Sequence, residues 1–133
     1  MRHSAACIFA LLLCACAPAT NFVAPSAAGK PGSESSKLVA ASEAKLFPCT
    51  IQDVKGADGA DAVDLGGSLK ADVTLPAGRY RVTLNCTSGY HIFKPQAELA
   101  ARGGKNYRIT GYLVDDSITI FNMKMQAKVA ELP

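Results

Sequence analysis

The sequence predicts an all-β protein, a small antiparallel β-sandwich of about 6–7 strands. Polar and apolar residues alternate over short runs, most clearly on the two sides of Pro76-Ala77-Gly78. Turn signals made of Gly, Pro, Asn and Asp recur about every 8–12 residues. Trp is absent, and no long helical pattern follows the N-terminal segment. Together these features favour a small β domain over a helical or mixed one.

The 133-residue chain has room for one domain. We expect a signal peptide over residues 1–15, a flexible linker over 16–44, the sandwich over 45–127 and a short C-terminal tail over 128–133. The formal net charge is +3, from 14 basic and 11 acidic residues spread along the chain. Because no basic cluster stands out, we expect no nucleic-acid partner.

The N-terminal segment begins with the positively charged Met1-Arg2-His3 and continues with an apolar run to residue 15. That run is too short to span a bilayer, which requires about 20 residues. A charged start followed by a short apolar core is typical of a helical secretory signal peptide. The alternative, a short transmembrane anchor, is disfavoured by the missing length.

The end of the apolar run, Leu13-Cys14-Ala15-Cys16, resembles the bacterial lipobox. In that motif an apolar residue stands three places before a lipidated cysteine and a small residue directly before it. The resemblance implies that Cys16 becomes the first mature residue and carries acyl chains that hold the protein in a membrane. Position 17 lacks the Asp that resembles an inner-membrane retention signal, which implies the periplasmic side of the outer membrane. The alternative is ordinary cleavage after Ala15, Ala17 or Ala19, with release of a soluble protein.

Residues 17–44 are rich in Pro, Gly, Ser and Ala. Such a composition buries too little apolar surface to offset the entropy lost on ordering. We therefore expect a disordered linker to about residue 36, with one or two helical turns over 36–45, that lets the domain stand off the membrane.

The alternating runs of the folded part predict its strands. We expect strands over residues 46–54, 69–75, 79–86, 90–101, 105–114 and 117–125, with a Gly- and Asp-rich loop over 55–67. The runs 69–75 and 79–86 are expected to pair as a β-hairpin. In the second run Tyr80, Val82, Leu84 and Cys86 share the buried face; in the run 105–114 that face carries Tyr107, Ile109, Gly111 and Leu113.

Two runs resemble the small transthyretin-like or PEGA-like β-sandwich modules of bacterial envelope proteins. In those modules a strand ends in a Pro-Gly turn before Tyr-x-Val, and a later Gly-Lys-x-Tyr opens another strand. The matching runs here are residues 73–82, with Pro76-Ala77-Gly78-Arg79-Tyr80, and 100–109, with Gly104-Lys105-Asn106-Tyr107. The resemblance covers about residues 49–121 and implies a fold, not a catalytic residue.

Five cysteines are present. If Cys7 and Cys14 leave with the signal peptide and Cys16 carries lipid, Cys49 and Cys86 remain as an even pair in an oxidising compartment. We predict that they form a disulfide, with both side chains on inward faces and the bond running through the sandwich. The alternative, a redox or metal pair, lacks Cys-x-x-Cys spacing and nearby His ligands.

No catalytic constellation stands out, because His91 is the one histidine left after signal-peptide removal. Carboxylates cluster in the loop at Asp53, Asp58, Asp61 and Asp64; we interpret them as a solvated acidic loop, with a calcium site as the alternative. We expect no metal and no cofactor. A possible binding face is formed by Arg79, Arg81, Tyr90, Lys94, Arg108 and Tyr112, for which the alternative is an ordinary polar sheet face.

The function expected from these features is that of a lipid-anchored envelope protein, not an enzyme, that acts as a structural or protein-interaction module. Its expected partners are the membrane, through the lipid, and an envelope protein. Two alternatives stay open: a lipoprotein that binds a small ligand or glycan, and an inhibitor or immunity protein against a secreted effector.

Overall fold

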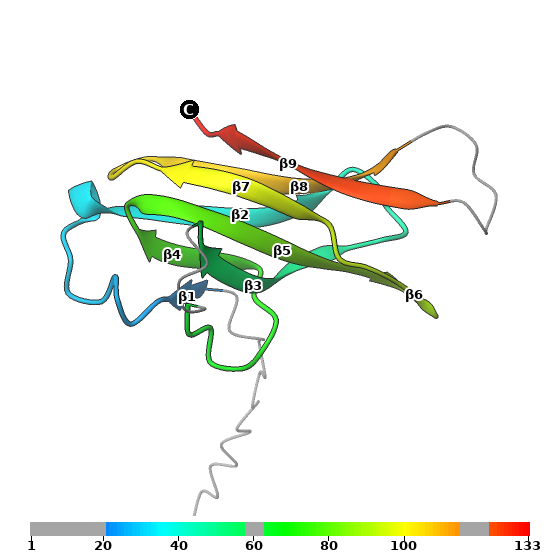
Figure 1. Ribbon diagram of the computed structural model, residues 1–133, viewed down its shortest axis with the longest axis horizontal. Helices are drawn as coiled ribbons and strands as arrows, with labels where there is room; N and C mark the ends of the chain where they lie inside the picture. Colours follow the sequence, from blue (N-terminus) through cyan, green and yellow to red (C-terminus); the bar gives the residue numbers. More distant parts are fainter. Residues whose placement is uncertain (1–20, 58–62, 115–122) are drawn as a thin grey trace, which may run out of the picture.

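The computed structural model describes residues 21–57, 63–114 and 123–133. Within these residues the chain forms nine strands and one short 3-10 helix, η1 (Gly32–Glu34), arranged as two facing sheets (Figure 1). The prediction of a small all-β sandwich is confirmed. The signal peptide, Cys16 and most of the predicted strand 117–125 lie outside the described residues.

The larger sheet has five strands in the order β1-β4-β2-β8-β9. Their bounds are β1 Asn21–Val23, β4 Asp72–Pro76, β2 Ser35–Ser42, β8 Asn106–Val114 and β9 Lys124–Glu131. Two of its four pairings, β1 with β4 and β2 with β8, are parallel. The prediction of a purely antiparallel sandwich is therefore wrong, since period-2 patterning carries no information on strand direction.

The smaller sheet has four strands. They are β3 Cys49–Gly56, β5 Gly78–Ser88, β6 His91–Phe93 and β7 Gln96–Ala101. The long β5 pairs with β3 along one edge and with β7 and then β6 along the other. The predicted single strand over residues 90–101 is thus two strands, interrupted at Lys94 and Pro95, which each pair with a different half of β5.

The runs on either side of Pro76-Ala77-Gly78 do not form the predicted hairpin. β4 belongs to the five-stranded sheet and β5 to the four-stranded one, so the three residues carry the chain across the core from one sheet to the other. Both strands still bury one face: Val73 and Leu75 on β4 pack toward Val82 and Leu84 on β5 in one apolar core. Alternation predicted the buried faces correctly, but it did not distinguish a hairpin from an arch between sheets.

The predicted linker over residues 16–44 is wrong from residue 21 onward, because β1 and β2 belong to the fold. β2 lies between β4 and β8, and its Leu38 is only 1% exposed. The strand resembles a linker in composition since five of its eight residues are Ser or Ala, yet its backbone pairs with a strand on each side. The Ser36 hydroxyl donates to the Arg102 carbonyl at 2.6 Å, which satisfies a buried polar group.

The predicted C-terminal tail over residues 128–133 is also wrong through Glu131. β9 pairs with β8 in an unbroken antiparallel register from Val114–Lys124 to Tyr107–Glu131. Its side chains alternate between half-buried and exposed, as expected for an edge strand over one core face. The apolar set Met125, Ala127 and Val129 packs against the core, so the strand contributes packing as well as backbone hydrogen bonds.

The Tyr80 hydroxyl closes the arch between β4 and β5. It donates to the Pro76 carbonyl at 2.7 Å, and burial of the half-buried ring raises the pKa of the phenol above its usual value. Tyr80→Phe is therefore expected to lower the free energy of unfolding by about 1 kcal/mol at neutral pH, the usual net contribution of one hydrogen bond.

The raised pKa gives this prediction a pH dependence. The fold favours the neutral phenol, so its contribution is complete below the unfolded pKa of about 10 and is lost as the pH rises through the folded pKa. Urea unfolding at neutral and alkaline pH is the measurement. The stability gap between wild type and Tyr80→Phe should narrow above about pH 10; a constant gap would contradict this assignment.

Candidate functional site

The six residues predicted to share one binding face lie in three separate places. Arg79 and Arg81 lie on β5 in the smaller sheet, and Arg108 and Tyr112 lie on β8 in the larger sheet. Tyr90 is at the turn between β5 and β6, and Lys94 follows β6. The prediction of a single face is wrong, because the alternation within each strand fixes its outer side but not the sheet to which the strand belongs.

The β5 arginines border a small hollow at the arch end of the smaller sheet. Arg81 pairs with Glu98 of β7 at 3.5 Å, with both side chains exposed. A cavity of about 190 Å³ lies beside this pair, lined by Ala57, Arg79, Tyr80, Glu98, Leu99 and Ala100. Ligand pockets commonly have volumes of about 300–1,000 Å³, so this hollow suits a fragment of a ligand rather than a whole one.

The β8 residues of the predicted face are partly engaged with β9. The Tyr112 hydroxyl hydrogen-bonds to Gln126 Oε1 at 3.0 Å, and the Lys128 ammonium lies 5.0 Å from the Tyr112 ring centroid. Lys128 also pairs with Glu43 at 2.6 Å. These contacts lie across neighbouring strands on the outer face and account for Tyr112 as a cross-strand packing residue.

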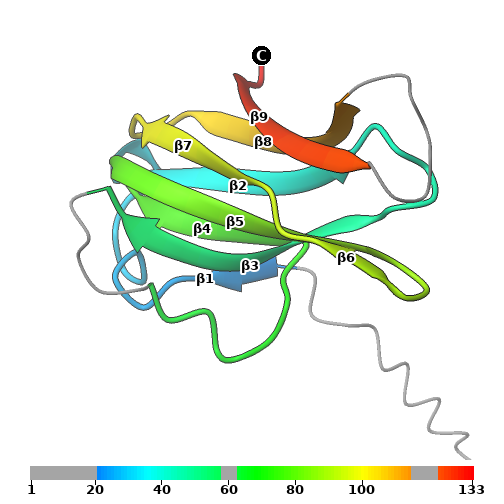
Figure 2. The same cartoon turned by 45° about the vertical axis from the view of Figure 1, so that its right-hand side comes forward.

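One end of the sandwich is formed by residues 43–48 and the β5–β6 hairpin (residues 87–94). We call it the hairpin end. The hairpin projects beyond the two sheets (Figure 2). Tyr90 at its tip is fully exposed and Ile92 is 61% exposed, while Leu46 in the neighbouring loop is 75% exposed. A cluster of exposed large apolar side chains marks a candidate interaction site.

The hairpin has an inner and an outer side. Phe93 opposes Cys86 in the register and packs edge-on against Phe47, with ring centroids 5.3 Å apart. Ile92 opposes Thr87 and therefore points to the outer side. Three exposed cationic or titratable side chains, Lys45, His91 and Lys94, lie among these apolar groups. The Phe47–Phe93 contact thus packs the inner side of the hairpin, and the outer side carries an exposed apolar residue flanked by lysines.

Sequence reasoning found Tyr90 and Lys94 of this end but missed Ile92 and Leu46. The signal was present in the alternation: with Phe93 inward, Ile92 must point outward, where an isoleucine has no core to enter. The alternation places Leu46 in the first predicted strand of the domain, but that strand, β3, begins only at Cys49.

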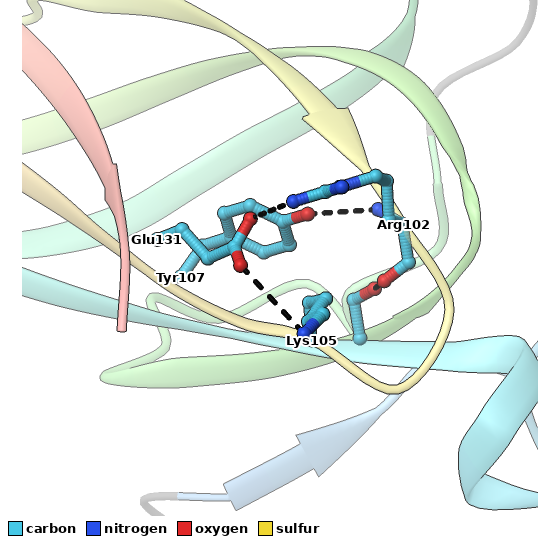
Figure 3. A network of polar contacts seen from close by, with 5 residues as sticks. Arg102, Lys105, Tyr107 and Glu131 are labelled. Carbon is cyan, nitrogen blue, oxygen red and sulfur yellow. Dashed lines mark hydrogen bonds and ion pairs between the residues drawn. The ribbon is translucent and has the colours of Figure 1, made fainter. Parts of the chain in front are cut away.

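The opposite end carries a polar network instead (Figure 3). Glu131 at the end of β9 pairs with the Arg102 guanidinium and, at 3.9 Å, with Lys105. The Tyr107 hydroxyl accepts a hydrogen bond from the Arg102 backbone N–H at 2.9 Å. The hydrogen bond to Glu131 raises the pKa of Arg102, which keeps the guanidinium charged. The network fastens the last strand to the β7–β8 turn and contains no nucleophile–base pair.

The predicted disulfide is present, but its course differs from the prediction. Cys49 and Cys86 are bonded and are register partners on the neighbouring strands β3 and β5. The bond therefore lies within one sheet instead of crossing the sandwich. It still faces the core, since Cys86 is fully buried and Gly111 of the other sheet lies directly against both sulfurs.

The acidic loop is described only at its two flanks. Asp53 pairs with Lys55 at 3.7 Å, and Asp64 accepts the Gly66 N–H at 2.8 Å; Asp58 and Asp61 lie outside the described residues. Among residues 21–57, 63–114 and 123–133, no group of three or more metal-ligating side chains is assembled. In the same ranges no helix combines the length and apolar character needed to cross a membrane.

No protein-family model, curated protein or solved structure matches this chain. The resemblance to transthyretin-like or PEGA-like modules therefore stays a prediction.

Proposed function

We propose that this chain is a lipid-anchored bacterial envelope protein, held on the periplasmic side of the outer membrane by acyl chains on Cys16. In this proposal the sandwich is a non-catalytic structural or protein-interaction module. The observation that carries the proposal is the lipobox-like Leu13-Cys14-Ala15-Cys16 at the end of a charged and then apolar N-terminal segment.

Two features of the folded part support this placement. The first described strand, β1, begins at Asn21, and four residues lie between Cys16 and this strand in the sequence. The Cys49–Cys86 disulfide suits an oxidising compartment such as the periplasm. Neither feature requires a ligand or a reaction. The role that we propose is therefore binding to another envelope protein or a structural role, and not catalysis.

Replacing Cys16 tests the anchor. In a Gram-negative host fed labelled palmitate, the wild-type chain should take up label and fractionate with the outer membrane, whereas Cys16→Ser should lose all label. Cys14→Ser is the matched control, because Cys14 would leave with the signal peptide and its loss should change neither label nor location. Retention of label in Cys16→Ser, or an unmodified soluble wild-type chain, would refute the proposal.

Chemical crosslinking of the anchored protein in intact cells tests the interaction role. We expect a defined envelope protein to be recovered with the wild-type chain. Recovery of no stable partner would count against the module and favour the alternative, a lipoprotein that binds a small ligand or glycan. The hollow beside Arg79 and Tyr80 supports that alternative, although its volume of about 190 Å³ is small for such a ligand.

A further inference from the structure

The structure shortens the distance between the proposed anchor and the folded domain. The predicted linker was long enough to hold the domain away from the bilayer, but β1 begins at Asn21. Five peptide units join Cys16 to Asn21, and a fully extended chain of that length spans at most about 18 Å. A domain anchored at Cys16 is therefore held close to the membrane surface.

The direction of β1 decides which end of the domain lies nearest. β1 runs parallel to β4, with Asn21 opposite Asp72, so the N-terminal side of β1 faces the same end of the sandwich as the start of β4. β4 runs toward the arch at residues 76–78, where β5 begins, and β5 runs from the arch to the hairpin tip. The N-terminal side of β1 and the hairpin thus point to the same end of the sandwich, as Figure 2 shows.

The hairpin reaches about as far in this direction as the anchor can. Lys70, just before β4, bridges to Ile51, the register partner of Leu84, so the start of β4 lies near the level of Leu84. Tyr90 adjoins His91, which pairs with Ser88, and the tip therefore lies about five residues beyond Leu84. At about 3.3 Å per residue the tip is about 17 Å beyond that level, and Cys16 reaches at most about 18 Å from Asn21. The tip can therefore meet the boundary between head groups and acyl chains, into which amphipathic elements sink by about 5–10 Å.

The side chains at the tip have the chemistry of that boundary. Tyr90 and Ile92 are exposed and apolar or amphipathic, and tyrosine favours the membrane–water interface. Lys45 and Lys94 beside them, both exposed, match anionic lipid head groups. The opposite end presents the Arg102–Glu131–Lys105 ion pairs.

From this agreement of reach and chemistry we propose that the β5–β6 hairpin inserts Tyr90 and Ile92 into the interface of the bilayer that carries the Cys16 anchor. This rests on the proposed function, since the geometry is set by acylation at Cys16. The insertion is a second contact that fixes the orientation of the domain and leaves the Arg102–Glu131 end facing the aqueous compartment.

The absence of Trp from the chain provides a direct test. Tyr90→Trp places a single indole at the hairpin tip, and Ala77→Trp is the matched control at the exposed arch on the opposite end. Each full-length variant is purified in its acylated form and reconstituted into vesicles of phosphatidylethanolamine and phosphatidylglycerol, with or without brominated acyl chains. We expect the Tyr90→Trp emission to shift to shorter wavelength and to lose intensity with bromolipid. Ala77→Trp should do neither and should stay open to quenching by iodide.

Two further measurements distinguish failure of the insertion proposal from failure of the proposed function. Ile92→Asp added to Tyr90→Trp should reverse the shift and the bromolipid quenching while leaving the thermal unfolding midpoint unchanged. Mass spectrometry of the same samples reports whether Cys16 is acylated. An unmodified Cys16 overturns the proposed function itself. An acylated protein whose Tyr90→Trp indole is as open to iodide as the Ala77→Trp indole overturns the insertion alone and assigns the apolar tip to a protein partner.

Discussion

Replacing both Cys49 and Cys86 by alanine is expected to lower the free energy of unfolding by about 4 kcal/mol, the largest effect of any change considered for this domain. The two cysteines are 37 residues apart, and closing a loop of that length removes much of the conformational freedom of the unfolded chain. A domain of this size buries a modest fraction of its surface and has little stability in reserve. The double variant should therefore be largely unfolded at physiological temperature.

Reduction of the wild-type protein isolates the cross-link from the change in side chain. Urea unfolding is followed by circular dichroism on three samples: oxidised wild type, reduced wild type and the double-alanine variant. Reduced wild type should lose nearly the same stability as the variant and regain it on reoxidation. Equal unfolding midpoints for the oxidised and reduced protein would show that the bond does not stabilise the fold.

The buried faces could be predicted from the sequence because alternation is a local property of a strand. The alternation predicts one buried side of β5 with Tyr80, Val82, Leu84 and Cys86, and the structure places the last three of them fully in the core. Tyr107, Ile109 and Gly111 on β8 were assigned equally well. The core is recognisable from the sequence for the same reason that it forms: each strand has one apolar side to bury.

The order and pairing of the strands could not be predicted, since they depend on contacts between distant segments. β2 is rich in Ala and Ser, a composition typical of a linker, and its place between β4 and β8 depends on Leu38 entering the core that the two sheets share. For the same reason the sequence could not show that the predicted binding residues lie in different sheets. Arg81 and Arg108 both alternate outward, but on strands of different sheets, so no periodicity could show that they are apart.

The candidate site was predictable only in part. The sequence shows Tyr90 and Lys94 as an aromatic residue and a cation near the start of a strand, but it does not show that the hairpin projects from the sandwich. The length of chain between Cys16 and the fold is the decisive quantity for the insertion proposal. It could not be read from composition, because β1 is only three residues long and owes its place to parallel pairing with β4.

Gly111→Ala is expected to destabilise the domain by about 1–3 kcal/mol, the usual cost of forcing extra volume into a packed core. Gly111 faces inward from β8 and lies against the disulfide of the opposite sheet. A Cβ atom there would lie 2.6 Å from Cys49 Sγ and 3.0 Å from Cys86 Sγ. Met125 Cε, at 3.3 Å, is the free end of a flexible side chain and can move aside, but the bonded sulfurs are held by two paired strands. The disulfide and the glycine therefore fit each other, and neither alone explains the close approach of the sheets at this point.

A double-mutant cycle tests this dependence. Urea unfolding is measured for Gly111→Ala in the wild type and in the Cys49→Ala/Cys86→Ala background, under conditions in which all four proteins are folded at zero denaturant. Removing the sulfurs opens the space that the new methyl group needs, so the cost of Gly111→Ala should fall to near zero, a coupling of about 1–3 kcal/mol between contacting sites. Ala127→Gly on the adjoining strand, which adds no volume, should cost the same in both backgrounds. If Gly111→Ala costs as much without the disulfide as with it, the glycine is required by the β8 backbone itself, and the inference that it makes room for the sulfurs is wrong.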